Sequence, residues 1–180
     1  EGLRKFEDGS IAVNGRMGIQ LQSSSLPEQI RAMEAVRLFA KWNKTKTDGT
    51  MLEALGIKEL GKKKYADMST GQKRRLHLAL ALVSDPDIVF LDEPTAGLDV
   101  EGRISLHEQI RRLKTQGKTI ILASHDMAEG GSLFGRIAIL RFGPVSFFGE
   151  GAGFTGKKSR RYRVHNKTSK GEENPGKGKN

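Results

Sequence analysis

The stretch IVFLDEP at residues 88–94 decides the fold of this chain. Its four consecutive apolar residues are typical of a strand buried on both faces, the usual state of a strand in a parallel sheet. Two carboxylates, Asp92 and Glu93, follow at the carboxyl end, where open α/β sheets bind their ligands. A carboxylate at a buried strand end is costly unless it is paired or bound to a cation. The pair therefore indicates a cation site, with a solvated strand end as the alternative.

The segments around this stretch alternate between helix and strand. Residues 69–84 predict the clearest helix, with Ser69 as its N-cap, and residues 119–123 (TIILA) predict another buried strand. Between the two strands, residues 100–115 predict an amphipathic helix ended by Gly117. The inward residues of that helix are expected to be Ile104, Leu106, Ile110 and Leu113. This order predicts an α/β fold built on a parallel sheet.

The rest of the chain predicts smaller elements. Strands are expected at residues 9–15 and 17–21, and helices from Pro27 and over residues 50–60, the latter broken near Gly56. Residues 25–68 are thus expected to form a small helical part. Two final strands are expected at residues 136–141 and 145–148. Residues 1–150 are thus expected to form one domain, and residues 151–180, rich in Gly, Lys, Ser and Asn, a basic and mostly flexible tail.

Composition narrows the possible functions. The chain has 180 residues and no cysteine, which excludes disulfides and Cys-ligated metals. Its net charge is +10, but nine Lys/Arg and two Glu beyond residue 156 account for +7 of it, so no nucleic acid is expected as a partner. No apolar run approaches the ~18 residues that span a bilayer, so a membrane role would come through a partner. The first residue is Glu1, which suggests a fragment or a processed chain.

The acidic pair gains meaning from polar residues that follow neighbouring strands. Asp92 can hold Mg²⁺ on a polyphosphate, and Glu93 can orient and deprotonate an attacking water. His125 follows the strand at residues 119–123, so it is expected at the same sheet edge, where it can bind a terminal phosphate and hold Glu93. Gln22 follows the strand at residues 17–21 and can bind metal-bound water, with Gln20 as a competing candidate.

A possible anion site precedes the clearest helix. The stretch MSTGQ at residues 68–72 combines a hydroxyl, a glycine and the amide groups of a helix N-terminus. A plain capping turn is the alternative interpretation of the same residues.

Four motifs in a fixed order, MSTGQ (68–72), LDEP (91–94), AGLD (96–99) and SHD (124–126), resemble those of the ATP-binding subunit of ABC transporters, over roughly residues 1–150. In that family the first is the signature motif, normally LSGGQ, and residues 88–92 are Walker B. The resemblance implies catalytic roles for Glu93, His125 and Gln22, and metal binding by Asp92 and Gln22. The residues implied to bind nucleotide are Ser69, Thr70, Gly71, Gln72 and Asp99.

The resemblance also implies the setting of the chemistry. The fold is expected to be P-loop NTPase-like with a small helical subdomain, and the cofactors to be ATP and Mg²⁺. In the family, two cassettes close face to face on ATP, and transmembrane permease subunits hold them at the cytoplasmic face of the membrane. The Lys-Arg-Arg run at residues 73–75 and the run into Ala79–Leu82 most resemble the exporter branch of the family. The family's Gly-rich phosphate loop is not found in this stretch of sequence, so it is expected upstream of Glu1, and this chain alone is expected to hydrolyse ATP poorly.

Thr70 stands where the signature motif has its first glycine, and Gly135 where the family usually has an aspartate. Two other functions are considered beside a transport ATPase. One is a non-catalytic cassette that pairs with an intact one and donates only its signature helix. The other is a nucleic-acid-acting ABC ATPase, although residues 22–69 contain no sustained heptads for a coiled-coil arm.

Overall fold

The computed structural model describes residues 10–22, 25–125, 133–140 and 145–150. The chain divides into two compact units, Glu1–Asp126 and Met127–Asn180, and each is described by itself. The tail predicted at residues 151–180 and the turn at residues 143–144 lie outside the described residues. The division at residue 150 and the helical part at residues 25–68 stay predictions.

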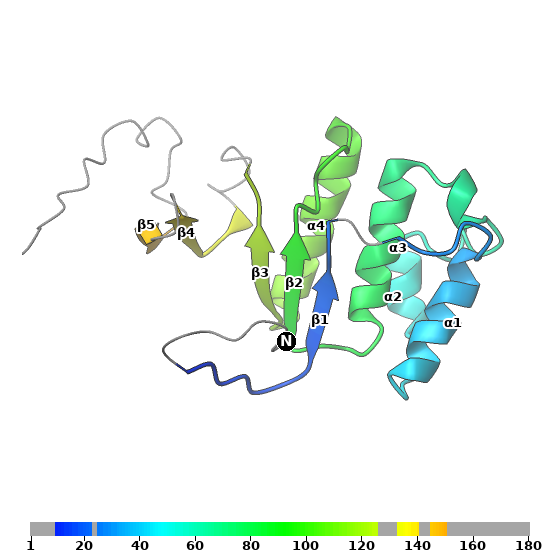
Figure 1. The fold of residues 1–180 in the computed structure, drawn as a ribbon, viewed down its shortest axis with the longest axis horizontal. Coiled ribbons are helices and arrows are strands. Elements are labelled where there is room, and N and C mark those ends of the chain that lie inside the picture. The colour runs from blue at the N-terminus through cyan, green and yellow to red at the C-terminus, as the bar shows by residue number, and fades with distance from the viewer. Residues whose placement is uncertain (1–9, 23–24, 126–132, 141–144, 151–180) are drawn as a thin grey trace, which may run out of the picture. The chain divides into compact units, whose positions relative to one another are not determined.

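A parallel sheet forms the centre of the first unit (Figure 1). Its strands are β1 (Met17–Gln20), β2 (Ile88–Asp92) and β3 (Thr119–Ala123), in the spatial order β1-β2-β3. The register aligns Gln20 with Leu91 and Leu91 with Leu122. The strand–helix–strand unit and the parallel sheet predicted from sequence are therefore confirmed.

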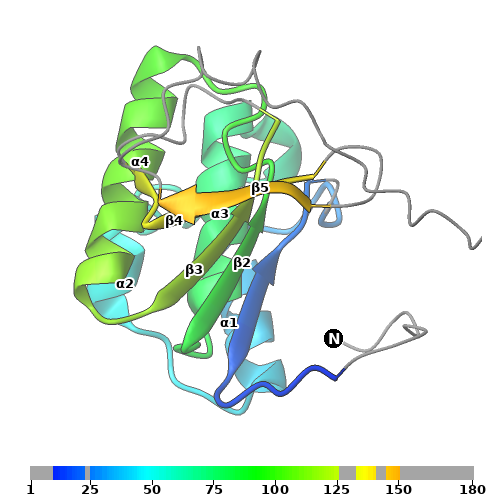
Figure 2. The same ribbon diagram turned by 90° about the vertical axis from the view of Figure 1, so that its left-hand side faces the viewer.

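Helices cover one face of this sheet, as Figures 1 and 2 show together. Helix α4 (Val100–Thr115) contacts β3, α3 (Thr70–Leu82) contacts β1, and α1 (Ala32–Trp42) contacts α3. The shorter helix α2 (Gly49–Ala54) and the 3₁₀ turn η1 (Tyr65–Asp67) complete the helical part of this unit. The apolar residues predicted for the buried face of α3 are all buried: Leu76, Leu78, Ala79, Leu80, Leu82 and Val83.

The opposite face of the sheet is more open than the sequence predicted. In β2 only Val89 and Leu91 are buried, while the alternate residues are partly exposed, and Ile121 in β3 is 47% exposed. The prediction that both strands are buried on both faces is wrong for the described structure, because no helix from its described residues lies on this second face. Ile104, predicted inward, is 55% exposed on α4.

Gly18 sets how closely β1 approaches α3. A Cβ atom at this position would lie 2.1 Å from the backbone oxygen of Ala81 and 2.8 Å from Pro86 Cγ, so only glycine fits without a shift of the backbone. Two further contacts fix the start of β1 beside β2: the Arg16 amide donates to Asp87 Oδ2 (2.8 Å), and the Asp87 amide donates to the Arg16 carbonyl (2.9 Å). Strand β1, which leads to Gln22, is therefore packed closely against α3 and hydrogen-bonded to the residue that precedes β2.

Three predicted elements are shorter or absent. The described residues 10–16 contain no strand, and Gly15 has a φ of +120°, which turns the chain into β1. The helix expected from Pro27 begins only at Ala32, because the Ile30 carbonyl accepts from the Tyr65 amide (2.9 Å) instead of from a helical partner. The helix expected over residues 50–60 ends at Ala54, and the break predicted near Gly56 is confirmed, because Gly56 has a φ of +65°.

A buried polar pair holds α3 against η1. Tyr65 Oη lies 2.9 Å from His77 Nε2, and the two rings meet edge to face. The Lys73 ammonium lies 4.8 Å from the centre of the Tyr65 ring, a cation–π contact. Burial lowers the pKa of His77 below its usual value, and the nearby positive charges of Arg74 and Lys73 lower it further.

This shift predicts a loss of stability in acid. The folded-state pKa of His77 lies below the unfolded value of 6.5, so the unfolded chain binds the proton more readily. The stabilisation is complete above that unfolded value and is lost as the pH falls through the folded pKa. Between pH 7 and pH 5 we expect His77→Gln to reduce the loss of unfolding free energy by up to about 1 kcal/mol. Urea unfolding of both proteins at pH 7, 6 and 5 measures this, and parallel pH profiles would contradict it.

The second unit contains an antiparallel pair, β4 (Arg136–Leu140) and β5 (Val145–Glu150), with a register shift at Ile139/Leu140. This confirms the two final strands predicted from sequence. Across the described part of the chain, every helix is too short or too polar to cross a bilayer.

Candidate functional site at the carboxyl edge of the sheet

The parallel register brings the predicted catalytic residues to one edge of the sheet. Asp92 is the last residue of β2 and pairs with Ala123, the last residue of β3. The Glu93 amide donates to the Ala123 carbonyl (2.9 Å), which keeps the two chains together one residue beyond the strand. Glu93 itself has a φ of +46°, a conformation that costs free energy for a residue with a side chain. Strain of this kind is concentrated at functional sites.

Glu93 and His125 form a direct pair. Glu93 Oε1 accepts from the His125 backbone amide at 2.9 Å and lies 2.8 Å from His125 Nδ1. The Glu93 side chain is 15% exposed and that of His125 84% exposed, so the carboxylate lies beneath an imidazole that faces solvent. A carboxylate has about four lone-pair sites, so these two bonds leave Glu93 able to accept a proton from water. The structure thus brings together two residues that the sequence placed at one edge.

Asp92 suits a magnesium ion that is shared with a polyphosphate. Strand alternation directs Asp92 away from the helix-covered face on which Leu91 is buried. The described residues contain no cluster of three or more His, Cys, Asp or Glu that could enclose a metal. Mg²⁺ in phosphate-transfer sites needs no such cluster, because one or two carboxylates, water and the substrate's phosphates complete its coordination. The hard oxygen donors of Asp92 and of the Gln22 amide fit that ion.

The two candidate glutamines lie in different environments. Gln20 is 2% exposed on the face of β1 that α3 covers, and its amide nitrogen and oxygen have no hydrogen-bond partner among the described residues. Gln22 lies in the turn after β1 and is exposed. Gln20 is thus enclosed beneath the sheet whereas Gln22 is open to solvent, and the site role of Gln22 stays a prediction.

The signature stretch begins α3 through a complete capping box. Ser69 Oγ accepts from the Gln72 amide at 3.3 Å, and Gln72 Oε1 accepts from the Ser69 amide at 3.1 Å. Lys63 Nζ donates to the same Gln72 oxygen at 2.9 Å. The capping turn and the anion site proposed for these residues are compatible, because the first amide groups of α3 still point along the helix axis.

The AGLD stretch packs on the signature stretch within this chain. A Cβ atom on Gly97 would lie 3.3 Å from Thr70 Cγ2, and one on Gly71 would lie 3.7 Å from a methyl group of Leu98. Gly97 has a φ of +75°, which favours glycine. Asp99 is the N-cap of α4, where its Oδ1 accepts from the Gly102 amide at 2.8 Å. The contact of Asp99 with nucleotide stays a prediction. Thr70 has room for its methyl group because the residue that faces it is Gly97.

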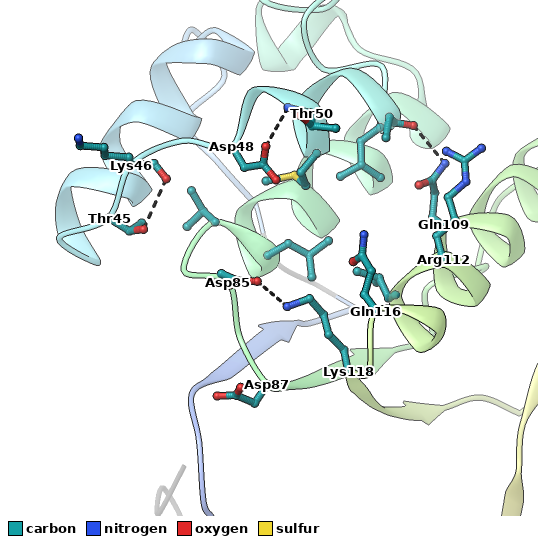
Figure 3. Close-up of a pocket in the computed structure, with 17 residues that line it drawn as sticks. Thr45, Lys46, Asp48, Thr50, Asp85, Asp87, Gln109, Arg112, Gln116 and Lys118 are labelled. Atoms are coloured by element: carbon teal, nitrogen blue, oxygen red, sulfur yellow. Dashed lines mark hydrogen bonds and ion pairs between the residues drawn. The ribbon is translucent and has the colours of Figure 1, made fainter.

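A cavity among the described residues lies elsewhere (Figure 3). It has a volume of about 570 Å³, and its walls come from α2, the turn after α3 and the end of α4. In it Lys118 Nζ donates to Asp85 at 2.5 Å, and this lowers the pKa of the Asp85 carboxyl. None of the predicted site residues lines it. The predicted site is therefore separate from this cavity.

Two residues near the site were not singled out from sequence. Lys63 holds Gln72, and Arg74 Nη1 donates to the Gln22 carbonyl at 3.0 Å. Both belong to basic runs, KKK at residues 62–64 and KRR at residues 73–75, in which the sequence alone does not distinguish one cation from its neighbours.

Comparisons with known proteins agree with this geometry. The family model described as ABC transporter matches residues 3–96. The Nod factor export ATP-binding protein I of Rhizobium johnstonii is 33% identical over 144 residues, covering 76% of this chain and 46% of that protein. The daunorubicin resistance ATP-binding protein DrrA3 of Streptomyces coeruleorubidus is 32% identical over 143 residues, covering 76% of this chain and 45% of that protein. The chain thus spans less than half of the length of these relatives.

A solved structure supports the fold. A chain from an inward-facing metal-chelate type ABC transporter superposes with a TM-score of 0.75 at 22% identity, covering 84% of this chain and 64% of that chain. At this identity the likeness concerns the fold alone, which is that of the P-loop ATPases of ABC transporters. The family match and the relatives together establish that this chain belongs to the ABC transporter family, as part of its ATP-binding domain.

Proposed function

We propose that the full-length gene product binds and hydrolyses ATP and thereby powers export through a membrane permease. The observation that carries this proposal is the Glu93–His125 pair, joined at 2.8 Å directly after the strand that ends in Asp92. The relatives that support it are named as ATP-binding proteins of Nod factor export and daunorubicin resistance.

Each residue of the edge has a separate task in this proposal. When bound, Mg²⁺ neutralises charge on the β- and γ-phosphates of ATP, and Asp92 and Gln22 are the residues that would hold it, directly or through water. Glu93 orients the attacking water and accepts its proton. His125 keeps Glu93 in place through Nδ1 and its backbone amide, and its Nε2 would contact the terminal phosphate. Because His125 is largely exposed, this contact requires a ligand or subunit above it.

In this proposal a second ATPase domain covers the exposed side of the site, above His125. The N-terminus of α3 with Ser69–Gln72 presents backbone amides and a positive helix end, which suit the γ-phosphate of a nucleotide held by a partner cassette. Asp99 and the AGLD stretch lie against the same helix start, so they would face the partner together with it.

An exposed apolar surface on α1 supports a membrane partner. Trp42 is 78% exposed and Leu38 is 52% exposed, one turn apart on the same helix, and Phe39 stacks at an angle on Trp42. Exposed apolar groups of this size are typical of a protein interface. We assign this surface to contact with a permease subunit, which would place the protein at the cytoplasmic face of the membrane.

The other two functions considered from sequence are less well supported. The two relatives named above are ATP-binding proteins of Nod factor export and of daunorubicin resistance, which favours a transport ATPase over both alternatives. The basic tail that kept a nucleic-acid partner in consideration lies outside the described residues.

A magnesium titration tests the proposed activity. The full-length gene product is expected to release phosphate from ATP only when Mg²⁺ is present, and excess EDTA is expected to abolish the release. In Asp92→Asn the Mg²⁺ concentration that gives half-maximal rate is expected to rise about tenfold or more, because one charged oxygen donor is lost. Asp67→Asn, at an exposed position on η1, is the matched control. ATP hydrolysis that persists in EDTA would refute the proposed site.

A further inference from the structure

Arg74 joins two parts of the site that are far apart in sequence. Its Nη1 donates to the main-chain carbonyl of Gln22 at 3.0 Å, across 52 residues. The bond reaches the turn beyond β1 rather than the strand itself, since β1 ends at Gln20. The position of the exposed Gln22 side chain is therefore set from α3 as well as from the sheet.

The helix that carries Arg74 also carries the signature stretch. Arg74 lies in the second turn of α3, just after the capping box formed by Ser69 and Gln72. The neighbouring basic residues have other contacts: Lys73 lies over the Tyr65 ring, and the Arg75 guanidinium lies beside Gly56. Within this basic run, Arg74 is thus the residue that hydrogen-bonds to Gln22.

The surroundings of Arg74 favour a stable contact. Its side chain is half-buried. Burial lowers the pKa of the neighbouring His77, and the Arg74 charge lowers that pKa further, whereas burial raises the pKa of Tyr65 and the Arg74 charge opposes that rise. A guanidinium has five donors in a fixed fork, so a bond to a carbonyl orients it strongly. Charge-assisted hydrogen bonds of this kind are about twice as strong as neutral ones.

We propose that Arg74 is a positioning residue that couples Gln22 to the signature helix. In the proposed function, Gln22 would bind the Mg²⁺ of its own cassette's nucleotide, whereas Ser69–Gln72 would contact the γ-phosphate of the partner's nucleotide. Because Arg74 links them, a displacement of Gln22 would also move the start of α3. A change at one nucleotide site would therefore change the geometry of the other. This inference rests on the proposed function for its catalytic consequence, but the link itself does not.

Hydrogen–deuterium exchange of the full-length gene product tests the link without reference to activity. In Arg74→Met the backbone amides of residues 21–26 are expected to exchange about fivefold faster than in the parent, because the turn loses its charge-assisted anchor. Arg74→Lys, which keeps the charge and one donor, is expected to restore part of the protection. Arg37→Met, at an exposed position on α1, is the control and is expected to exchange like the parent. Unchanged exchange of residues 21–26 in Arg74→Met would overturn the inference.

Steady-state kinetics test the consequence. Because Arg74 binds a main-chain carbonyl and not phosphate, Arg74→Met is expected to lower kcat about fivefold with KM for ATP within twofold, at an unchanged Tm. A parallel loss of Tm and kcat would assign Arg74 a merely structural role and overturn the inference. If the parent has no ATPase activity, the proposed function fails, whereas the exchange experiment still decides whether Arg74 holds Gln22.

Discussion

Replacement of Glu93 by glutamine in the full-length gene product is expected to reduce ATP hydrolysis at least about 100-fold, because a general base is removed. The amide keeps the shape of the side chain and can still accept from the His125 backbone amide through its oxygen. It cannot accept a proton from water. ATP affinity is expected to stay within about threefold, since Glu93 acts on water rather than on the ground-state nucleotide. Phosphate release and equilibrium binding of a fluorescent ATP analogue measure the two quantities.

Glu101→Gln is the matched control for this experiment. Glu101 is an exposed glutamate in the first turn of α4, eight residues from Glu93. Its replacement by glutamine makes the same chemical change at a position outside the edge. Its hydrolysis rate is expected to equal that of the parent. Wild-type turnover in Glu93→Gln would show that another group accepts the proton, and the assignment of the general base would then be wrong.

Strand β3 and helix α4 were predictable because their ends are encoded locally. Residues 100–115 and 119–123 match the structure to the residue: Asp99 caps the start of α4, and Gly117, with a φ of +81°, separates it from β3. The capping box at Ser69 fixes the start of α3 in the same way. Where a cap or a glycine marks an end, the sequence contains the physical cause of the boundary.

Burial and long-range contacts were less predictable, because they depend on what packs where. An apolar run such as TIILA is the same whether one face of its strand is covered or both, so the exposure of Ile121 could not be deduced. The helix start at Ala32 depends on a hydrogen bond from Tyr65, 35 residues beyond Ile30, and periodicity within one segment cannot reveal it. The Arg74–Gln22 bond is of the same kind.

The candidate site combines both kinds of information. Chain order and register together brought Glu93 and His125 to one edge, since carboxyl ends of neighbouring parallel strands necessarily meet there. The residues alone left both Gln20 and Gln22 open, the resemblance pointed to Gln22, and their different burial became visible only in the structure. Gln22 owes its place at the edge to the path of β1, and that path depends on one small residue.

Gly18→Ala is expected to destabilise the full-length gene product by about 3 kcal/mol or more, because the new methyl group meets backbone rather than a movable side chain. The new methyl carbon would lie 2.1 Å from the Ala81 carbonyl oxygen. Ala81 lies near the end of α3, and its neighbours Leu80 and Leu82 are buried. Relief requires β1 to move away from α3, which also displaces Gln22 from the edge. Gly49→Ala is the matched control: its nearest neighbour would be Lys58 Nζ at 3.9 Å, and alanine as the first residue of α2 favours the helix. Urea unfolding followed by circular dichroism measures both variants, and equal midpoints would mean that β1 and α3 do not approach each other as closely as the structure shows.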